Sequence, residues 1–186
     1  MISNETAPRR RTAAGWSAMA GGLIMAGLGV SQAVQPFDTN PLVLGLEHLT
    51  LGLLAVSLIL LVPGLIALAR HGGRAALVGA ATVSVGHVLL AFGATSSNLH
   101  GKDYPWFVFV AIPANLAMLA GGIVMAVSLW RTGHVPRLVT AILPLLWLFE
   151  IILSQLGGSL VAGVYWLVVG RMFVAGTADR RLAATG

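Results

Sequence analysis

Four ionisable residues that could do acid–base chemistry interrupt otherwise apolar stretches of the sequence. Glu47 and His48 are adjacent near the start of an apolar run over residues 42–69, and His87 and Glu150 lie within two later runs. Carboxyl and imidazole groups are the usual proton donors and acceptors of general acid–base catalysis. Because an isolated charge in apolar surroundings is costly, we expect these side chains to face one another or a wet cavity.

The four expected catalytic residues differ in role. Glu150 lies in the run LLWLFEIIL, with no polar neighbour before Ser154, and is the expected proton donor. Glu47 is the expected partner carboxylate, and His48 or His87 would orient the partners or accept a proton. Structural interpretations remain open: Glu47 and His48 could reach water, and His87 could form a hydrogen bond with a neighbouring helix.

Four further residues are expected to bind a substrate beside these groups. Trp147 and Trp166 lie within apolar runs, where an indole face could stabilise a carbocation by cation–π attraction. Asn115 lies within another apolar run, and Asp103 lies in the polar stretch SSNLHGKDYP. Such a pocket suits the protonation of a lipophilic molecule.

The composition indicates that the elements positioning these residues are surrounded by lipid. Of the 186 residues, 57% are hydrophobic and only 9% are charged, whereas about a quarter are charged in soluble domains. The net charge of +5 comes from basic residues scattered between apolar runs, which argues against a nucleic-acid partner. The sequence has no cysteine, which excludes disulfides and thiolate metal sites.

The apolar runs predict an all-α bundle of six transmembrane helices over residues 15–177. A bilayer core requires about 20 apolar residues in a helix, and turn-forming stretches separate the runs. The basic segment 1–14 and the segment 178–186 are expected to be tails, the first of them disordered. The predicted spans are 15–34, 42–69, 74–96, 106–130, 138–156 and 158–177.

The distribution of basic residues predicts that both termini are cytoplasmic. With this orientation every arginine falls on or near the cytoplasmic side and Lys102 alone falls outside, as the positive-inside rule requires. The ten-to-one excess of arginine over lysine is typical of a GC-rich bacterial genome, so we expect a multi-pass protein of the bacterial inner membrane. Glu47, His48, His87 and Glu150 would then share one layer of the outer leaflet, about 8–13 Å below its surface.

In its size, span number and paired acidic residues the sequence resembles small membrane-bound terpene cyclases. The resemblance implies a lyase or isomerase that starts the cyclisation or isomerisation of an isoprenoid-like substrate by protonation. It implies Glu150 as the acid and Glu47 as its partner, and no cofactor or metal is expected.

Two other classes of function stay open. The same pocket could serve non-enzymatic binding or proton-coupled transport of a small molecule, for which six helices are few and a homodimer is expected. His48 and His87 could also bind one haem iron from neighbouring helices. A metal site of Glu47, His87 and Glu150 lacks the close ligand spacing of helical metal sites. No nucleotide-binding, zinc-protease or serine-hydrolase motif is present.

Overall fold

The computed structural model describes residues 6–35 and 41–176, and in these ranges the chain is all-α without a named strand. One isolated bridge joins Leu42 to Lys102. The elements are α1 Thr6–Val34, α2 Leu46–Ala69, α3 Gly73–His100, α4 Phe107–Thr132, α5 Arg137–Ile142, η1 Leu143–Leu145, η2 Leu148–Ile152, η3 Ser154–Leu156 and α6 Gly158–Val174.

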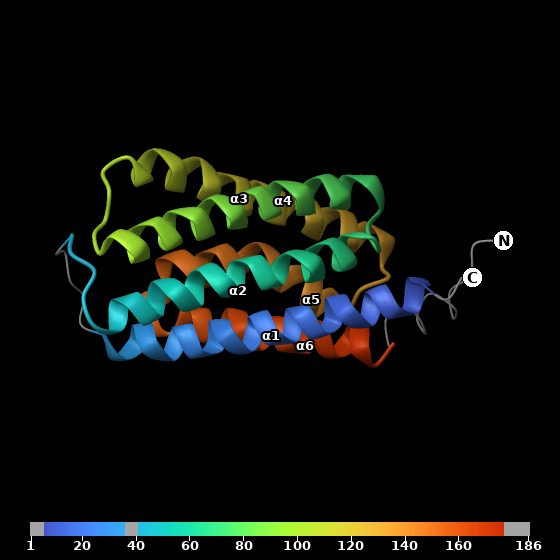
Figure 1. Ribbon diagram of the computed structural model, residues 1–186. Coiled ribbons are helices and arrows are strands. Elements are labelled where there is room, and N and C mark those ends of the chain that lie inside the picture. Colours follow the sequence, from blue (N-terminus) through green and yellow to red (C-terminus); the bar gives the residue numbers. More distant parts are fainter. Residues whose placement is uncertain (1–5, 36–40, 177–186) are drawn as a thin grey trace.

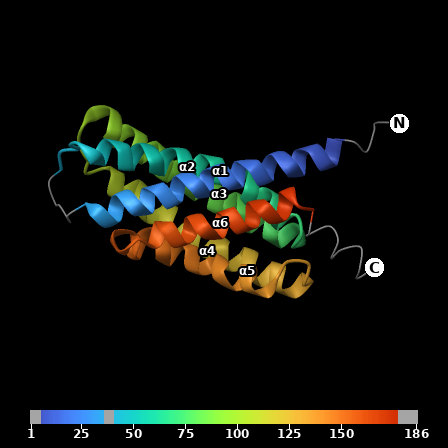
Figure 2. The same cartoon turned by 90° about the horizontal axis from the view of Figure 1, so that it is seen from below.

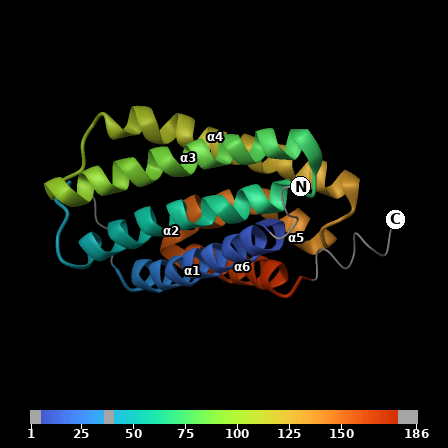
Figure 3. The ribbon, with the colours of Figure 1, turned by 45° about the vertical axis from the view of Figure 1, so that its right-hand side comes forward.

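These elements form a closed ring of antiparallel segments. Helix α1 packs along α6 and α2, and α3 packs along α2 and α4 (Figures 1 and 3). The segment from α5 to η3 contacts both α4 and α6 and so closes the ring. Helix α1 begins and α6 ends at the same end of the bundle (Figures 1 and 2). The described chain therefore runs along the bundle an even number of times.

Four helices are long and apolar enough to cross a membrane: Arg11–Val34, Leu46–Ala69, Gly73–His100 and Phe107–Thr132. They correspond to the first four predicted spans. Helix α6 is also apolar but has only 17 residues, about 25 Å of helix. These helices indicate a membrane protein, whereas the predicted number of six spans and the cytoplasmic termini stay predictions.

The fifth predicted span, 138–156, is an interrupted helix. Pro144 lacks a backbone N–H and lies in the 3₁₀ turn η1, directly after α5. Next, η2 is a π-helical turn in which the Leu153 N–H bonds to the Leu148 carbonyl at 3.0 Å. Gly157 then adopts φ +81°, a left-handed conformation that glycine tolerates, and turns the chain into α6. Short irregular turns of this kind are common at functional sites.

The N-terminal tail is shorter than the predicted segment 1–14, because α1 already begins at Thr6. The stretch after Thr6 is rich in alanine and arginine, which favour helix, and Pro8 falls in the first turn, where proline is tolerated. Residues 1–5 and the predicted tail 178–186 lie outside the described residues.

Glycines let pairs of helices pack backbone to backbone. A Cβ atom on Gly22 of α1 would lie 2.8 Å from the carbonyl oxygen of Gly163 in α6, and one on Gly79 of α3 would lie 2.7 Å from that of Gly121 in α4. Close approach of this kind is typical of helix pairs in membranes. The two tight pairs hold α1 and α6 together on one side of the ring and α3 and α4 on the other.

Charges are separated between the two ends of the bundle. Arg70 and Arg74 flank the turn between α2 and α3, and Arg131 and Arg137 flank the turn between α4 and α5. Arg11 and Arg171 lie near the start of α1 and the end of α6, so they belong to the same end. Lys102, directly after α3, is the only lysine of the chain and lies at the opposite end.

Candidate functional site

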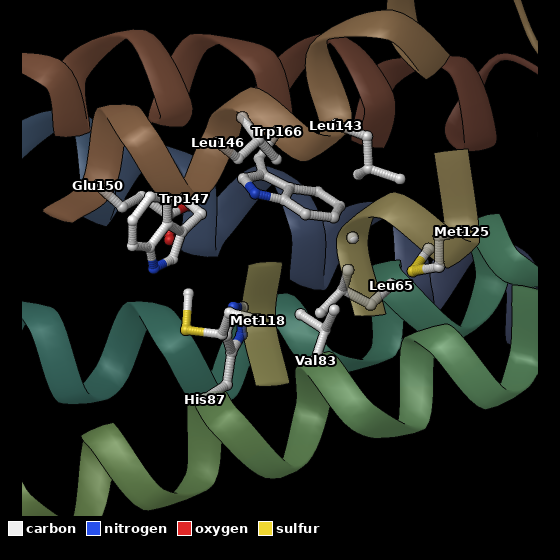
Figure 4. A pocket seen from close by; sticks show the side chains of 11 residues that line it. Leu65, Val83, His87, Met118, Met125, Leu143, Leu146, Trp147, Glu150 and Trp166 are labelled. Atoms are coloured by element: carbon white, nitrogen blue, oxygen red, sulfur yellow. The ribbon is translucent and has the colours of Figure 1, made fainter. Parts of the chain in front are cut away.

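Two neighbouring hollows lie within the ring of helices, and Glu150 and Met118 line both. The larger cavity has a volume of about 230 Å³, and the smaller pocket, of about 20 Å³, is large enough for one water molecule. The smaller pocket is lined by Leu65, Val83, His87, Met118, Gly122, Met125, Leu143, Leu146, Trp147, Glu150 and Trp166 (Figure 4). The larger is lined by Met25, Gln32, Leu51, Leu54, Leu58, Leu90, Ala94, Ser97, Asp103, Phe107, Ala111, Asn115, Met118, Glu150, Ile151, Ser154 and Ser159.

Glu150 lies in the π-helical turn η2 and is only 9% exposed. Figure 4 shows its carboxyl group directed into the pocket beside Trp147 and Met118. Within the described part of the chain its side chain forms no hydrogen bond and no ion pair. A carboxyl group in the interior without a partner is costly.

His87 faces Glu150 from the opposite wall of the smaller pocket. Its imidazole is 2% exposed, and in Figure 4 it extends from α3 toward Met118, with Glu150 beyond. The Nδ1 atom lies 3.1 Å from the carbonyl oxygen of Leu58 in α2. Because a carbonyl can only accept, Nδ1 carries the proton, and Nε2 of the neutral ring is a proton acceptor. The structure therefore brings an acid and a base to one pocket from η2 and α3.

Three of the four expected substrate-binding residues lie around this pair. The Trp147 indole donates to Oδ1 of Asn115 at 3.1 Å, and Asn115 donates to the Ala111 carbonyl at 2.8 Å, so the irregular segment is fastened to α4. Trp166 is 1% exposed and stacks edge-on against Tyr165, with ring centroids 5.3 Å apart. Its indole N–H has no partner among the described residues.

Asp103, the fourth of these residues, lines the larger cavity at the end of the bundle. It is exposed in the loop that follows α3, where its backbone N–H bonds to the Pro41 carbonyl at 2.7 Å. The larger cavity thus extends from a water-facing carboxyl group, Asp103, to a buried one, Glu150.

Sequence reasoning missed three polar residues of the larger cavity: Gln32, Ser97 and Ser159. The Ser159 hydroxyl donates to Oε1 of Gln32 at 2.8 Å, which joins α6 to α1. In the sequence, each of these residues is only a polar residue near the end of an apolar run. Such residues are common at helix ends, so the sequence does not show whether their side chains line a cavity or lie on the surface.

Glu47 and His48 line neither hollow. Glu47 accepts a hydrogen bond from the Leu44 N–H at 2.7 Å, which satisfies a backbone donor at the start of α2. His48 is exposed and pairs through Nδ1 with Oδ1 of Asn98 at 2.6 Å. The expected convergence of four ionisable residues is therefore not observed, because the backbone just before α2 engages Glu47 and Asn98 of α3 engages His48.

This separation also bears on haem and metal binding. Asn98, the partner of His48, lies eleven residues beyond His87 on α3, about 16 Å along the helix. His48 and His87 therefore cannot both reach one iron atom. No group of three or more metal-ligating side chains occurs among the residues for which the structure gives positions.

The described site thus contains an unpartnered acid, a base with a defined tautomer, two tryptophans and a cavity with leucine-rich walls. Comparisons of the chain with protein families, curated proteins and solved structures found no match.

Proposed function

We propose that the protein crosses the bacterial inner membrane six times, with both termini in the cytoplasm. The even number of antiparallel segments supports this topology, as does the collection of the described arginines at the end where α1 begins and α6 ends. The 17-residue α6 and the interrupted helix from α5 to η3 would supply the last two crossings. Glu150 and the larger cavity then lie toward the outer half of the membrane.

Within this topology, the larger cavity binds a small lipophilic molecule on which Glu150 performs acid–base chemistry. The observation that carries this proposal is the Glu150 carboxyl group, which lines both hollows and has no partner in the described chain. An engineered apolar cavity of about 150 Å³ takes up benzene, so the volume of about 230 Å³ suits a ligand of roughly nine non-hydrogen atoms. This size corresponds to a short isoprenoid-like molecule.

The proposed reaction is a protonation-initiated isomerisation or cyclisation. The Glu150 O–H bond breaks and a C–H bond forms on a substrate alkene, or an O–H bond forms on an epoxide, which leaves positive charge on carbon. The face of Phe107, which lines the larger cavity, would stabilise that charge by cation–π attraction, while Trp147 and Trp166 line the smaller pocket on the other side of Glu150. The neighbouring carbon would lose a proton through a water molecule in the smaller pocket to His87 Nε2, which lines only that pocket. A new double bond forms, and the proton returns to Glu150. This cycle fits the resemblance to small membrane-bound terpene cyclases.

Deuterium incorporation tests the proposal. The protein in lipid nanodiscs is incubated in D₂O with a panel of short isoprenoid alkenes and epoxides, and the products are analysed by mass spectrometry. We expect at least one substrate of the panel to be converted. An alkene would give an isomer with one carbon-bound deuterium, and an epoxide would give a rearranged product. E150Q should lose this conversion. Wild-type protein that is folded yet converts no more of any substrate than E150Q would contradict the proposal.

A second candidate function, proton-coupled binding or transport, is favoured by one specific observation. The larger cavity reaches from the exposed Asp103 to the buried Glu150, so one cavity connects a water-facing carboxyl group with an interior one. Paired acids in spans serve as proton relays in transporters. A homodimer would be expected in this case. Substrate-dependent proton flux into liposomes, with no chemical change of the substrate, would distinguish transport from catalysis.

A further inference from the structure

The ionisable residues that line the larger cavity are all acidic. Asp103 and Glu150 are among them, whereas no lysine, arginine or histidine is. Most uncharged polar groups have partners: Asn115 bonds to Trp147 and Ala111, Ser159 to Gln32, and Ser154 to the Ile151 carbonyl. The Ser97 hydroxyl and the Gln32 amide N–H groups have no hydrogen bond among the described residues. The two carboxyl groups are therefore the only ionisable hydrogen-bonding positions that the described wall offers to a ligand, beside the neutral Ser97 hydroxyl and Gln32 amide N–H groups.

The rest of the wall is apolar. Leu51, Leu54 and Leu58 follow one face of α2, and Leu90 and Phe107 come from α3 and α4. A ligand that fills this space must be largely hydrocarbon, with one polar group that can reach Glu150. Because Glu150 is 9% exposed and has no partner among the described residues, the ligand group that meets it gains a strong interaction that no protein group supplies.

We propose that the ligand is a small lipophilic amine. The uncharged amine enters from the lipid or past Asp103, and Glu150 transfers its proton: the carboxyl O–H bond breaks, an N–H bond forms, and an ammonium–carboxylate pair results. Asp103 at the mouth attracts cations and repels anions. The face of Phe107, which lines the same cavity, adds cation–π attraction. This inference rests on the proposed binding of a lipophilic molecule in the same cavity, and it names the ligand class for the second candidate function, binding or transport, because an amine that takes the Glu150 proton leaves no acid to protonate an alkene.

Three probes that share one hydrocarbon cage test the charge preference: adamantan-1-amine, adamantan-1-ol and adamantane-1-carboxylate. Binding to the protein in nanodiscs is measured by titration calorimetry, with partitioning into protein-free nanodiscs subtracted. We expect the amine to bind at least about tenfold more tightly than the alcohol, and the carboxylate not to bind. In E150Q the ratio of amine to alcohol affinity falls to about one.

Two further variants serve as controls. E47Q changes the acid outside the cavity and should keep the wild-type ratio. L54W fills the cavity from α2 and should abolish binding of all three probes while the protein elutes as wild type in size-exclusion chromatography.

The outcomes separate this inference from the function on which it rests. Alcohol binding as tight as amine binding to the wild-type protein would overturn the amine assignment and leave a neutral lipophilic substrate in place. The ratio of amine to alcohol affinity, measured on the wild-type protein alone, tests the amine assignment even if E150Q does not fold. Failure of all three probes to bind folded wild-type protein would overturn both the amine assignment and the proposed cavity function.

Discussion

The protein contains two pairs of a glutamate and a histidine, and their surroundings differ in almost every respect. Glu47 and His48 are adjacent at the start of α2, where each has a hydrogen-bond partner and His48 is exposed. Glu150 and His87 are 63 residues apart in the sequence, yet they line one pocket in the interior. In the inner pair the Glu150 carboxyl group and His87 Nε2 have no partner in the described chain.

The contrast between the two pairs shows why residue type alone does not identify a catalytic site. At the start of a helix, a carboxyl group can satisfy free backbone N–H groups and so contribute to folding. In the interior, an unpartnered carboxyl group costs folding free energy, and proteins commonly retain such groups where function needs them. We therefore assign the first pair to stability and the second to the proposed reaction, and variants of matched residues can separate the two roles.

The largest expected effect on the reaction rate comes from replacing the Glu150 carboxyl group by an amide of the same shape, which has no acidic proton. E150Q should lower the rate of substrate conversion by about 100-fold or more, because general acid–base catalysis contributes about 10²- to 10⁴-fold. E47Q, the matched change in the outer pair, should keep the rate within about twofold of wild type. Initial rates in nanodiscs check both values, and equal losses in the two variants would remove the distinction between the pairs.

Substitution of the histidines is expected to have a smaller effect on the reaction rate. In H87N the amide N–H takes the place of Nδ1–H and can still donate to the Leu58 carbonyl, whereas the acceptor Nε2 is lost. We expect a rate about tenfold lower or more, with an unchanged melting temperature, because the variant loses only a proton acceptor. H48N should leave the rate unchanged. A rate for H87N equal to that of wild type would show that His87 has only a structural role.

The smallest expected effects are on stability, and they have opposite signs for the two glutamates. E150M replaces an unpartnered buried carboxyl group by an apolar one and should stabilise the fold by about 1–3 kcal/mol. E47M removes the acceptor for the Leu44 N–H and should destabilise it by about 1 kcal/mol. Thermal unfolding in one detergent gives both shifts. A lower melting temperature for E150M would indicate that Glu150 has a structural partner.

The first four spans could be predicted from the sequence because each apolar run is long enough to cross a bilayer by itself. The run 42–69 contains α2, which begins at Leu46, and 74–96 lies within α3. The interrupted fifth segment could not be predicted in detail. Pro144 disturbs a helix wherever it stands within one, but the π-helical turn at Leu148–Ile152, which packs against α6, has no separate signal in the sequence.

The candidate site was only partly predictable for a related reason. Depth along a helix can be counted from the sequence, but it placed all four ionisable residues in one layer and did not separate Glu150 and His87 from Glu47 and His48. The direction of a side chain around the helix depends on which neighbours close the ring, and this decides that Glu150 and His87 line one pocket while Glu47 does not. The position of Glu47, in the first turn of α2 and a few residues after Pro41, was a local signal for a helix-terminal role.

The most direct test of the account is chemical labelling of the two glutamates with a lipophilic carbodiimide. This reagent partitions into apolar regions, adds to a carboxylic acid and rearranges to a stable N-acylurea. The account predicts that peptide mapping of the nanodisc-embedded protein finds the adduct on Glu150 and not on Glu47, and that adamantan-1-amine slows its formation. An adduct on Glu47 with none on Glu150 would contradict the claim that Glu150 opens into a cavity accessible to lipophilic molecules.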